Sequence, residues 1–263
     1  MDINELNALR KEVLKIVKKT GHYIYQQAGS ASLQIETKSE NSLVTLVDKE
    51  AERQLVSGLQ KLLPSASFIT EEGTVKQQES DIQWIIDPLD GTTNFIQNIP
   101  FYSTSVALQI DGEIVLGVVN LIPLDITFHA IKNGGAYEGE EKMKVSSKSK
   151  LENCIVATGF PYERNNIQNQ LYQSFMQILN NVRGIRRLGS AALDLAFVAS
   201  GRMDAYFETN LNPWDVAAGI LLVKEADGRM SDYLGGNDFY SGSKIVASNR
   251  KVHDKILQLI DHS

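Results

Sequence analysis

The chain has 263 residues, of which 43% are hydrophobic, so it can bury a sizeable core. Its formal net charge of −6 argues against a general binder of nucleic acid, because such proteins concentrate Lys and Arg against the phosphate backbone. The longest apolar runs, residues 114–119 and 216–223, are too short to span a membrane, and residues 1–19 carry charges where a signal peptide needs an apolar stretch. We therefore predict a cytoplasmic globular protein without a nucleic-acid or membrane partner. Because the protein is acidic, it would need bound cations to bind phosphate groups.

Helices are expected first along the chain. Apolar residues recur every three or four positions from Leu6 to Ile24, which predicts an amphipathic helix that ends near Gly29. A second helix is predicted over residues 48–63, and a short strand over residues 67–70.

Strands dominate the next segment. The sequence predicts them over residues 84–86, 103–110, 113–122 and 125–131. The pair Asp111-Gly112 between two apolar runs is typical of a β-hairpin.

After residue 135, strands and helices alternate. We predict strands over residues 154–158 and 203–207, and helices over residues 166–180, 190–199, 213–226 and 252–260, the last on the surface. The single cysteine, Cys154, lies in an apolar stretch and is interpreted as a small core residue. No long polar linker separates the halves, so two stacked α/β layers are expected, residues 1–150 and 151–263.

The segment Asp87-Pro88-Leu89-Asp90-Gly91 carries the strongest sign of chemistry. An apolar strand is predicted to end at Asp87, where Pro88 turns the chain and leaves two carboxylates three residues apart. Gly91 permits the close approach of a ligand, and the N–H groups of residues 91–93 could cradle phosphate oxygens. Such an arrangement suits a metal ion that bridges protein and phosphate. The alternative is an ordinary turn with solvated aspartates, whereas an EF-hand loop fits poorly because its alternating acids are missing.

Other acidic residues stand at two further element ends. Glu71 and Glu72 follow the strand predicted to end at residue 70, and their alternative role is a polar loop. Asp215 follows Trp214 in the first turn of an apolar helix, where a single acid often only stabilises the helix dipole.

Four segments in chain order resemble the inositol monophosphatase family of Mg²⁺-dependent, lithium-sensitive sugar phosphatases. They are Leu43-Val44-Thr45 with Asp48, Glu71-Glu72, Asp87-Pro88-Leu89-Asp90-Gly91-Thr92-Thr93-Asn94 and Trp214-Asp215-Val216-Ala217-Ala218-Gly219. One such segment would be weak evidence, but four in register are specific. The resemblance implies an α+β fold, the layered α/β sandwich of the inositol monophosphatase and fructose-1,6-bisphosphatase type, and a homodimer.

The resemblance also implies a set of metal ligands. These are the side chains of Glu71, Asp87, Asp90 and Asp215 and the backbone carbonyl of Leu89, which would hold two or three Mg²⁺ ions. A shell of oxygen ligands is what Mg²⁺ prefers, and the four histidines lie outside every motif.

A proton relay is implied as well. In the family pattern, the Thr92 hydroxyl and Asp48 accept the proton of the attacking water, while Glu71 holds the metal that carries this water. Asp48 could instead only cap the second predicted helix. No covalent phosphoenzyme is expected.

The implied substrate contacts are the backbone of Gly91 and Thr92 for the phosphate, and the Ala191 N–H and Glu208 carboxylate for ring hydroxyls. Glu208 could instead be a solvated acid at a strand end. Inositol monophosphate is the favoured substrate, with fructose 1,6-bisphosphate, adenosine bisphosphate and NADP as alternatives. A bisphosphate needs a second phosphate contact, which a cluster of arginines could supply: Arg183, Arg186 and Arg187. A non-catalytic regulator is less favoured, because the catalytic elements are all present.

Two segments extend or depart from the resemblance. Ser42 stands where the family often has Asp. Whether the segment 38–42 forms a lid as in the family, and whether a third metal binds, is therefore left open. Residues 159–166 are expected to form a loop on the substrate side.

Overall fold

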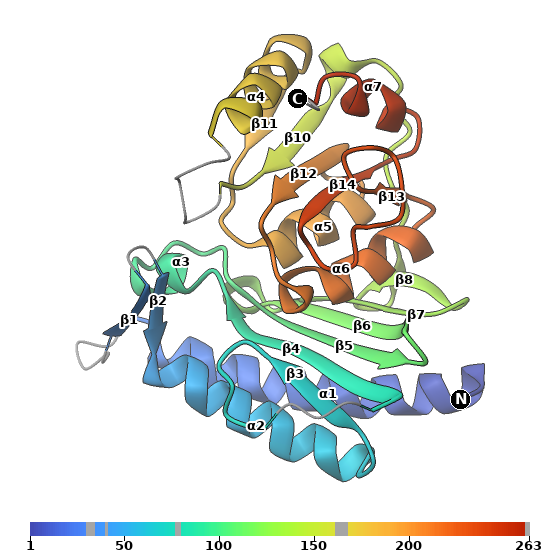
Figure 1. Cartoon of the computed structure of the whole chain (residues 1–263). Helices are drawn as coiled ribbons and strands as arrows, with labels where there is room; N and C mark the ends of the chain where they lie inside the picture. The colour runs from blue at the N-terminus through green and yellow to red at the C-terminus, as the bar shows by residue number, and fades with distance from the viewer. Residues whose placement is uncertain (30–34, 40–41, 77–79, 161–167, 261–263) are drawn as a thin grey trace.

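The computed structural model describes residues 1–29, 35–39, 42–76, 80–160 and 168–260. Helices and sheets alternate in layers, with a helix pair outside the larger sheet, a second pair between the two sheets, and further helices outside the smaller sheet (Figure 1). Two sheets and their helices stacked in layers confirm the predicted α+β layered sandwich. None of the helices in the described ranges is both long and apolar enough to cross a membrane.

The larger sheet has seven strands. In spatial order they are β3 (Ser67–Thr70), β4 (Ile82–Asp90), β5 (Ser103–Ile110), β6 (Glu113–Leu121), β7 (Ile126–Ile131), β8 (Gly135–Glu138) and β9 (Glu141–Lys142). Only the β3–β4 pairing among them is parallel. Asp111 and Gly112 join β5 to β6 with φ angles of 51° and 78°, the left-handed conformation of a tight hairpin, so the hairpin prediction is confirmed.

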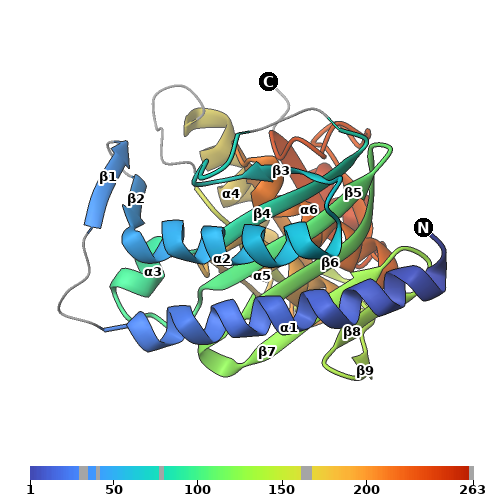
Figure 2. The same cartoon turned by 90° about the horizontal axis from the view of Figure 1, so that it is seen from below.

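Two long helices, α1 (Ile3–Gln27) and α2 (Leu46–Leu62), cover the outer face of this sheet (Figure 2). Asp2 and Glu5 form a capping box at the start of α1, which satisfies backbone donors that the helix itself cannot. The apolar stripe of α1 packs with Leu55 of α2 and Trp84 of β4 in one buried cluster. Both predicted N-terminal helices are therefore confirmed.

The helices α5 (Ala191–Ala199) and α6 (Pro213–Glu225) lie between the two sheets. Gly117 of β6 allows α6 to approach closely, because a Cβ there would lie 2.9 Å from the Ala218 carbonyl oxygen. The largest buried cluster joins these helices to both sheets.

The smaller sheet is mixed. Its strands, in spatial order, are β11 (Gly184–Arg186), β10 (Ile155–Thr158), β12 (Ala205–Thr209), β14 (Lys244–Ser248) and β13 (Arg229–Ser231). The strand predicted over residues 203–207 thus starts two residues later and extends to Thr209, which puts Glu208 inside it.

The outer face of the smaller sheet carries α4 (Gln168–Asn181) and α7 (His253–Leu257). The helix predicted over residues 252–260 is present on this outer face, but it is shorter, His253–Leu257. Val252, Ile256 and Ile260 are buried in a common cluster with strand residues, and the helix is one short piece. The predicted start of α4 at residue 166 lies outside the described residues.

Short elements complete the chain. They are β1 (Ile35–Ser39), β2 (Ser42–Thr45), α3 (Thr92–Ile96) and two 3₁₀ turns at Ile122–Leu124 and Leu151–Asn153. The strands β1 and β2 form an antiparallel hairpin.

The segment predicted to divide the chain near residue 150 is fastened to the C-terminal half. Asp204, fully buried, accepts hydrogen bonds from Ser146 Oγ (2.5 Å), Lys148 Nζ (2.9 Å) and the Ile155 N–H (2.7 Å). A buried carboxylate needs such partners, so this junction is held firmly. The division into residues 1–150 and 151–263 stays a prediction.

His253 should make the stability of the protein sensitive to acid. Its ring is buried between the hydroxyl groups of Ser231 and Ser248, both at 2.8 Å. Burial, with a smaller effect of Arg229, lowers its pKa from 6.5 to about 4. The unfolded chain therefore binds a proton between these pH values that the folded protein does not, so stability is complete above about pH 6.5 and is lost as the pH falls towards 4.

This loss should be at most roughly 3 kcal/mol, and His253→Gln should remove it. Urea unfolding of both proteins at several pH values between 7.5 and 4.5 measures the difference. Parallel pH profiles for the two proteins would contradict the prediction.

Candidate active site

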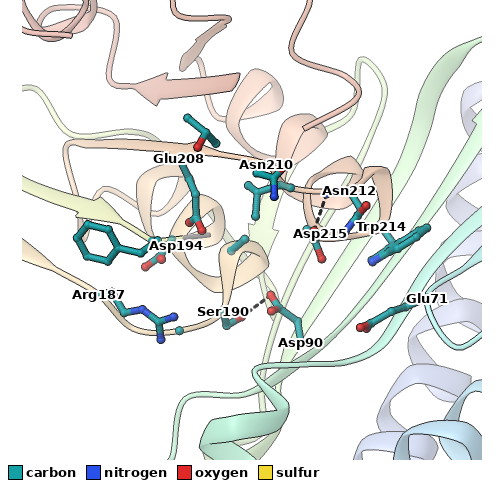
Figure 3. A pocket seen from close by; sticks show the side chains of 16 residues that line it. Glu71, Asp90, Arg187, Ser190, Asp194, Glu208, Asn210, Asn212, Trp214 and Asp215 are labelled. Carbon is teal, nitrogen blue, oxygen red and sulfur yellow. Dashed lines mark hydrogen bonds between the residues drawn. The ribbon is translucent and has the colours of Figure 1, made fainter. Parts of the chain in front are cut away.

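A cavity of ≈ 260 Å³ lies between the two sheets and is lined by residues from both halves of the chain (Figure 3). The N-terminal half contributes Glu71 and Asp90. The C-terminal half contributes a larger set: Gly159, Phe160, Arg187, Gly189, Ser190, Ala191, Asp194, Glu208, Thr209, Asn210, Leu211, Asn212, Trp214 and Asp215. Side chains far apart in sequence therefore share one cavity.

The strand β4 brings two aspartates to this region. It does not end at Asp87 as predicted but continues to Asp90, with an irregular register towards β5 between these two residues. Pro88 lacks an N–H, and its carbonyl accepts a hydrogen bond from Thr104 (2.9 Å). Asp87 Oδ1 accepts one from the Leu89 N–H (2.9 Å), which orients the buried carboxylate.

Gly91 follows as the N-cap of α3 in the left-handed conformation, with φ of 93°. A Cβ at this position would lie 3.1 Å from the carbonyl oxygens of both Phe101 and Gly189. Only glycine fits without strain, because both the φ angle and the close backbone exclude a side chain. The glycine thus allows the start of α3 to pack closely against the segment that leads to α5.

Asp90 connects the halves of the molecule. Its Oδ2 accepts hydrogen bonds from Ser190 Oγ (2.7 Å) and the Ala192 N–H (2.9 Å), at the start of α5. Nearby, Asn94 Nδ2 donates to the Leu188 carbonyl (2.7 Å). These contacts orient the Asp90 carboxylate towards the cavity that it lines.

Asp215 stands in the first turn of α6 and is part of a capping box with Asn212. Its Oδ2 accepts a hydrogen bond from the Asn212 N–H (2.6 Å). The residue also lines the cavity, so its carboxylate can take part in a site there in addition to capping the helix.

Glu71 follows β3, and its N–H donates to the Ile86 carbonyl (3.2 Å). The loop after it is held by Glu52 of α2, a fully buried acid that the sequence analysis missed. The Glu52 carboxylate accepts hydrogen bonds from the N–H groups of Glu72 and Thr74, both at 2.7 Å. The available signal was its spacing, since Glu52 lies one helical turn after Asp48 on the same face of the helix.

Asp48 is buried in the first turn of α2, and its carboxylate faces Thr92. The Thr92 hydroxyl lies 3.0 Å from Asp48 Oδ1 and 3.1 Å from the Leu89 carbonyl oxygen, so its single proton can serve either acceptor. Gly91, not Thr92, is the N-cap of α3, and it makes no side-chain cap. The Asp48–Thr92 pair predicted from the sequence is therefore close in space.

Negative charge accumulates around Asp87. Burial raises its pKa well above the ordinary value, and the carboxylates of Glu71, Asp90 and Asp215 raise it further. Burial likewise raises the pKa of Asp90 to about 6, although hydrogen bonds from Ser190 and Ala192 oppose this. Burial and Asp90 also raise the pKa of Asp215.

These shifts mean that the carboxylates disfavour one another's charge, a situation that a bound cation would relieve. Across the described ranges, no three His, Cys, Asp or Glu side chains already lie in an arrangement that could hold a metal ion. The four acids are thus near enough to shift one another's pKa, but their side chains would have to move closer together to bind one ion.

Glu208, predicted to contact the substrate, also lines the cavity. Glu208 in β12 accepts a hydrogen bond from the Tyr206 hydroxyl (2.7 Å), and burial raises the pKa of its carboxyl to about 7. It packs against Gly159, where a Cβ would overlap the carboxylate at 2.0 Å. Glu208 is therefore not a solvated strand-end acid.

Ala191 also lines the cavity, whereas the N–H of its neighbour Ala192 is used by Asp90. Of the three arginines considered for a second phosphate, Arg187 lines the cavity. Arg183 instead donates to Asn153, and Arg186 donates to the Ile185 carbonyl, both at exposed positions.

Two loops were predicted beside the site. Residues 40–41 of the lid-like segment and residues 161–166 of the substrate-side loop lie outside the described residues. Phe160, at the start of the second loop, lines the cavity.

Three similar proteins bear on this site. An inositol-1-monophosphatase of Mesorhizobium japonicum is 36% identical over 256 residues, which cover 97% of this chain and 96% of the relative. The Nus factor SuhB of Escherichia coli K12 is 38% identical over 241 residues, covering 91% and 90%. A solved structure of an IMPase/NADP phosphatase complexed with Mg²⁺ and phosphate matches with a TM-score of 0.86 at 26% identity, covering 98% and 97%.

A family model extends the match to almost the whole chain. The model described as the inositol monophosphatase family matches residues 5–263, from the start of α1 past the end of α7. The chain therefore belongs to the inositol monophosphatase family.

Proposed function

We propose that the protein is a Mg²⁺-dependent phosphatase that hydrolyses a phosphate monoester, with inositol monophosphate as the favoured substrate. The observation that carries this proposal is the group of four acids, Glu71, Asp87, Asp90 and Asp215, whose charges oppose one another in or beside the cavity. Family membership and the Mg²⁺ in the similar IMPase/NADP phosphatase structure support it.

The donor set fits a magnesium ion. All four acids offer oxygen atoms, and every charged neighbour that shifts the pKa of Asp87 is itself a carboxylate among the described residues. The four side chains and the Leu89 carbonyl would hold the ions. When bound, Mg²⁺ would supply a water of lowered pKa and neutralise charge on the phosphoryl oxygens.

The protein's own groups would position the reaction. The Thr92 hydroxyl would accept a hydrogen bond from the attacking water while donating its own proton to Asp48 Oδ1, 3.0 Å away. The backbone at Gly91 and Thr92, which starts α3, would bind the phosphate. Glu208 and the backbone of Ala191, which both line the cavity, would orient the alcohol part of the substrate.

The alternative substrates differ in whether they need a positively charged side chain to bind a second phosphate. Fructose 1,6-bisphosphate and adenosine bisphosphate carry another phosphate. Among the described residues that line the cavity, Arg187 is the one cation, and Asp194, Glu208 and Asp90 lie there as well. This acidic surrounding favours an uncharged polyol. NADP phosphatase activity is a further alternative, supported by the name of the similar structure.

A second candidate function follows from the Escherichia coli relative. Its name, Nus factor SuhB, and its 38% identity support a regulatory role for this chain, with or without catalysis. A cytoplasmic location, lithium sensitivity and a homodimer likewise remain proposals.

Magnesium dependence tests the proposed function directly. We expect phosphate release from inositol 1-phosphate in Mg²⁺ and none in excess chelator, because without the ions the four acids would repel the phosphoryl group and no water of lowered pKa would be supplied. Fructose 1,6-bisphosphate, adenosine bisphosphate and NADP serve as the comparison panel. Full activity in chelator would exclude the metal mechanism, and no release from any ester in Mg²⁺ would favour the regulatory role.

A further inference from the structure

Asp194 is a buried acid in the cavity for which the mechanism above has no use. It lies in the first turn of α5 and is 1% exposed, yet it lines the cavity. In Figure 3 it lies between Glu208 and Arg187, and both residues act electrostatically on it. Its Oδ1 is buried without a hydrogen-bond partner among the described protein groups.

The first turn of α5 is a favourable place for an acid, because it lies near the positive end of the helix dipole, but this position gives the buried Oδ1 of Asp194 no hydrogen-bond partner among the described residues. The other residues of α5 are all apolar: Ala191, Ala192, Leu193, Leu195, Ala196, Phe197, Val198 and Ala199. A buried carboxyl oxygen without a partner is unfavourable, and an apolar side chain would avoid this penalty. The unpaired oxygen of Asp194 could accept a hydrogen bond from a ligand that enters the cavity.

The chemistry around Asp194 indicates what kind of ligand group this is. Glu208 is also acidic, and among the described residues Arg187 is the cation that acts on both carboxyl groups. Two acids around one arginine would repel a second phosphate, whereas neutral hydroxyl groups can donate hydrogen bonds to both.

We propose that Asp194 is a specificity-determining residue that hydrogen-bonds a hydroxyl group on the polyol part of the substrate, beside the hydroxyl bound by Glu208. This inference rests on the proposed phosphatase function. It makes the polyol subsite a pair of acids from α5 and β12, and it separates polyol esters from phosphate esters that lack hydroxyl groups.

The test compares two esters of the same ring, inositol 1-phosphate and cyclohexyl phosphate, which lacks the hydroxyl groups. Asp194→Ala should lower kcat/KM for inositol 1-phosphate by about tenfold, mainly through KM, since a hydrogen bond between the carboxyl group and the substrate hydroxyl is lost. Hydrolysis of cyclohexyl phosphate should change less than about threefold. Asp194→Asn, which keeps an acceptor oxygen, should recover part of the loss.

Asp227→Ala is the matched control, because this exposed carboxylate pairs with Lys144 and Arg250 outside the cavity lining. It should leave both esters unaffected. An equal loss on both esters in Asp194→Ala would overturn the inference, since it would indicate a structural role, and so would unchanged kinetics on both.

The failure of the proposed function is recognised separately. If the wild type hydrolyses neither ester in Mg²⁺, the phosphatase proposal fails, and calorimetric binding of inositol 1-phosphate decides the subsite. Weaker binding to Asp194→Ala than to the wild type would still support the role of Asp194. Equal binding to both proteins, or binding to neither, would overturn it.

Discussion

Asp90→Asn should abolish phosphate release while the fold survives. The amide oxygen of Asn can accept the hydrogen bonds from Ser190 Oγ and the Ala192 N–H that Asp90 Oδ2 accepts now. The connection between the halves is therefore kept. What is lost is one negative charge of the proposed metal site, so the ions would bind more weakly and the phosphoryl group would lose its neutralising charge.

Thermal unfolding separates this effect from misfolding. Without metal, the variant should melt at or above the temperature of the wild type, because Asp90 and Asp215 no longer repel each other. With Mg²⁺, the wild type should gain stability by mass action and the variant should gain much less. Phosphate release should fall by about a thousandfold or more, the order expected when a transition-state charge loses its partner.

Asp125→Asn is a suitable control for this variant. Asp125 is exposed in a turn after the 3₁₀ segment, with φ of 49°, a conformation that Asn also tolerates. It should keep full activity and the full Mg²⁺ response. If Asp90→Asn hydrolyses inositol 1-phosphate at the wild-type rate, Asp90 is not a metal ligand.

Local sequence signals predicted the elements of this fold well. The Asp111-Gly112 turn and the helix α1 can each be predicted from residues close together in the sequence, and both predictions are confirmed. The prediction failed where distant pairing decides the outcome. The sequence analysis missed β14, whose partner β12 lies almost forty residues earlier.

The same distinction applies to the site. The acids with a recognisable local motif, such as Asp87 and Asp90, were predicted from the sequence, and the structure makes them electrostatic neighbours. Glu52 was missed because its role depends on the Thr74 N–H, 22 residues away in the chain. Asp194 was missed because an isolated acid in an apolar helix has meaning only once the cavity is known.

The proton relay can be tested apart from the metal ligands with Thr92→Ala. The substitution removes the hydroxyl that lies 3.0 Å from Asp48 Oδ1 and keeps the backbone of α3. Positioned proton acceptors contribute about a hundred- to ten-thousandfold to turnover, so kcat should fall by that order while KM and Mg²⁺ affinity change little. Thr92→Ser keeps a hydroxyl at this position and should restore most of the activity.

The pair can also be tested as a unit, because a relay fails when either member is removed. Asp48→Asn should lower kcat about as much as Thr92→Ala, and the double variant should be hardly slower than either single variant. If Thr92 only stabilised the start of α3, each variant would cost roughly 1 kcal/mol of stability and leave kcat unchanged. Measured kcat values, metal titrations and melting temperatures of the four proteins distinguish these outcomes. Losses in kcat that multiply in the double variant would mean that Asp48 and Thr92 act independently.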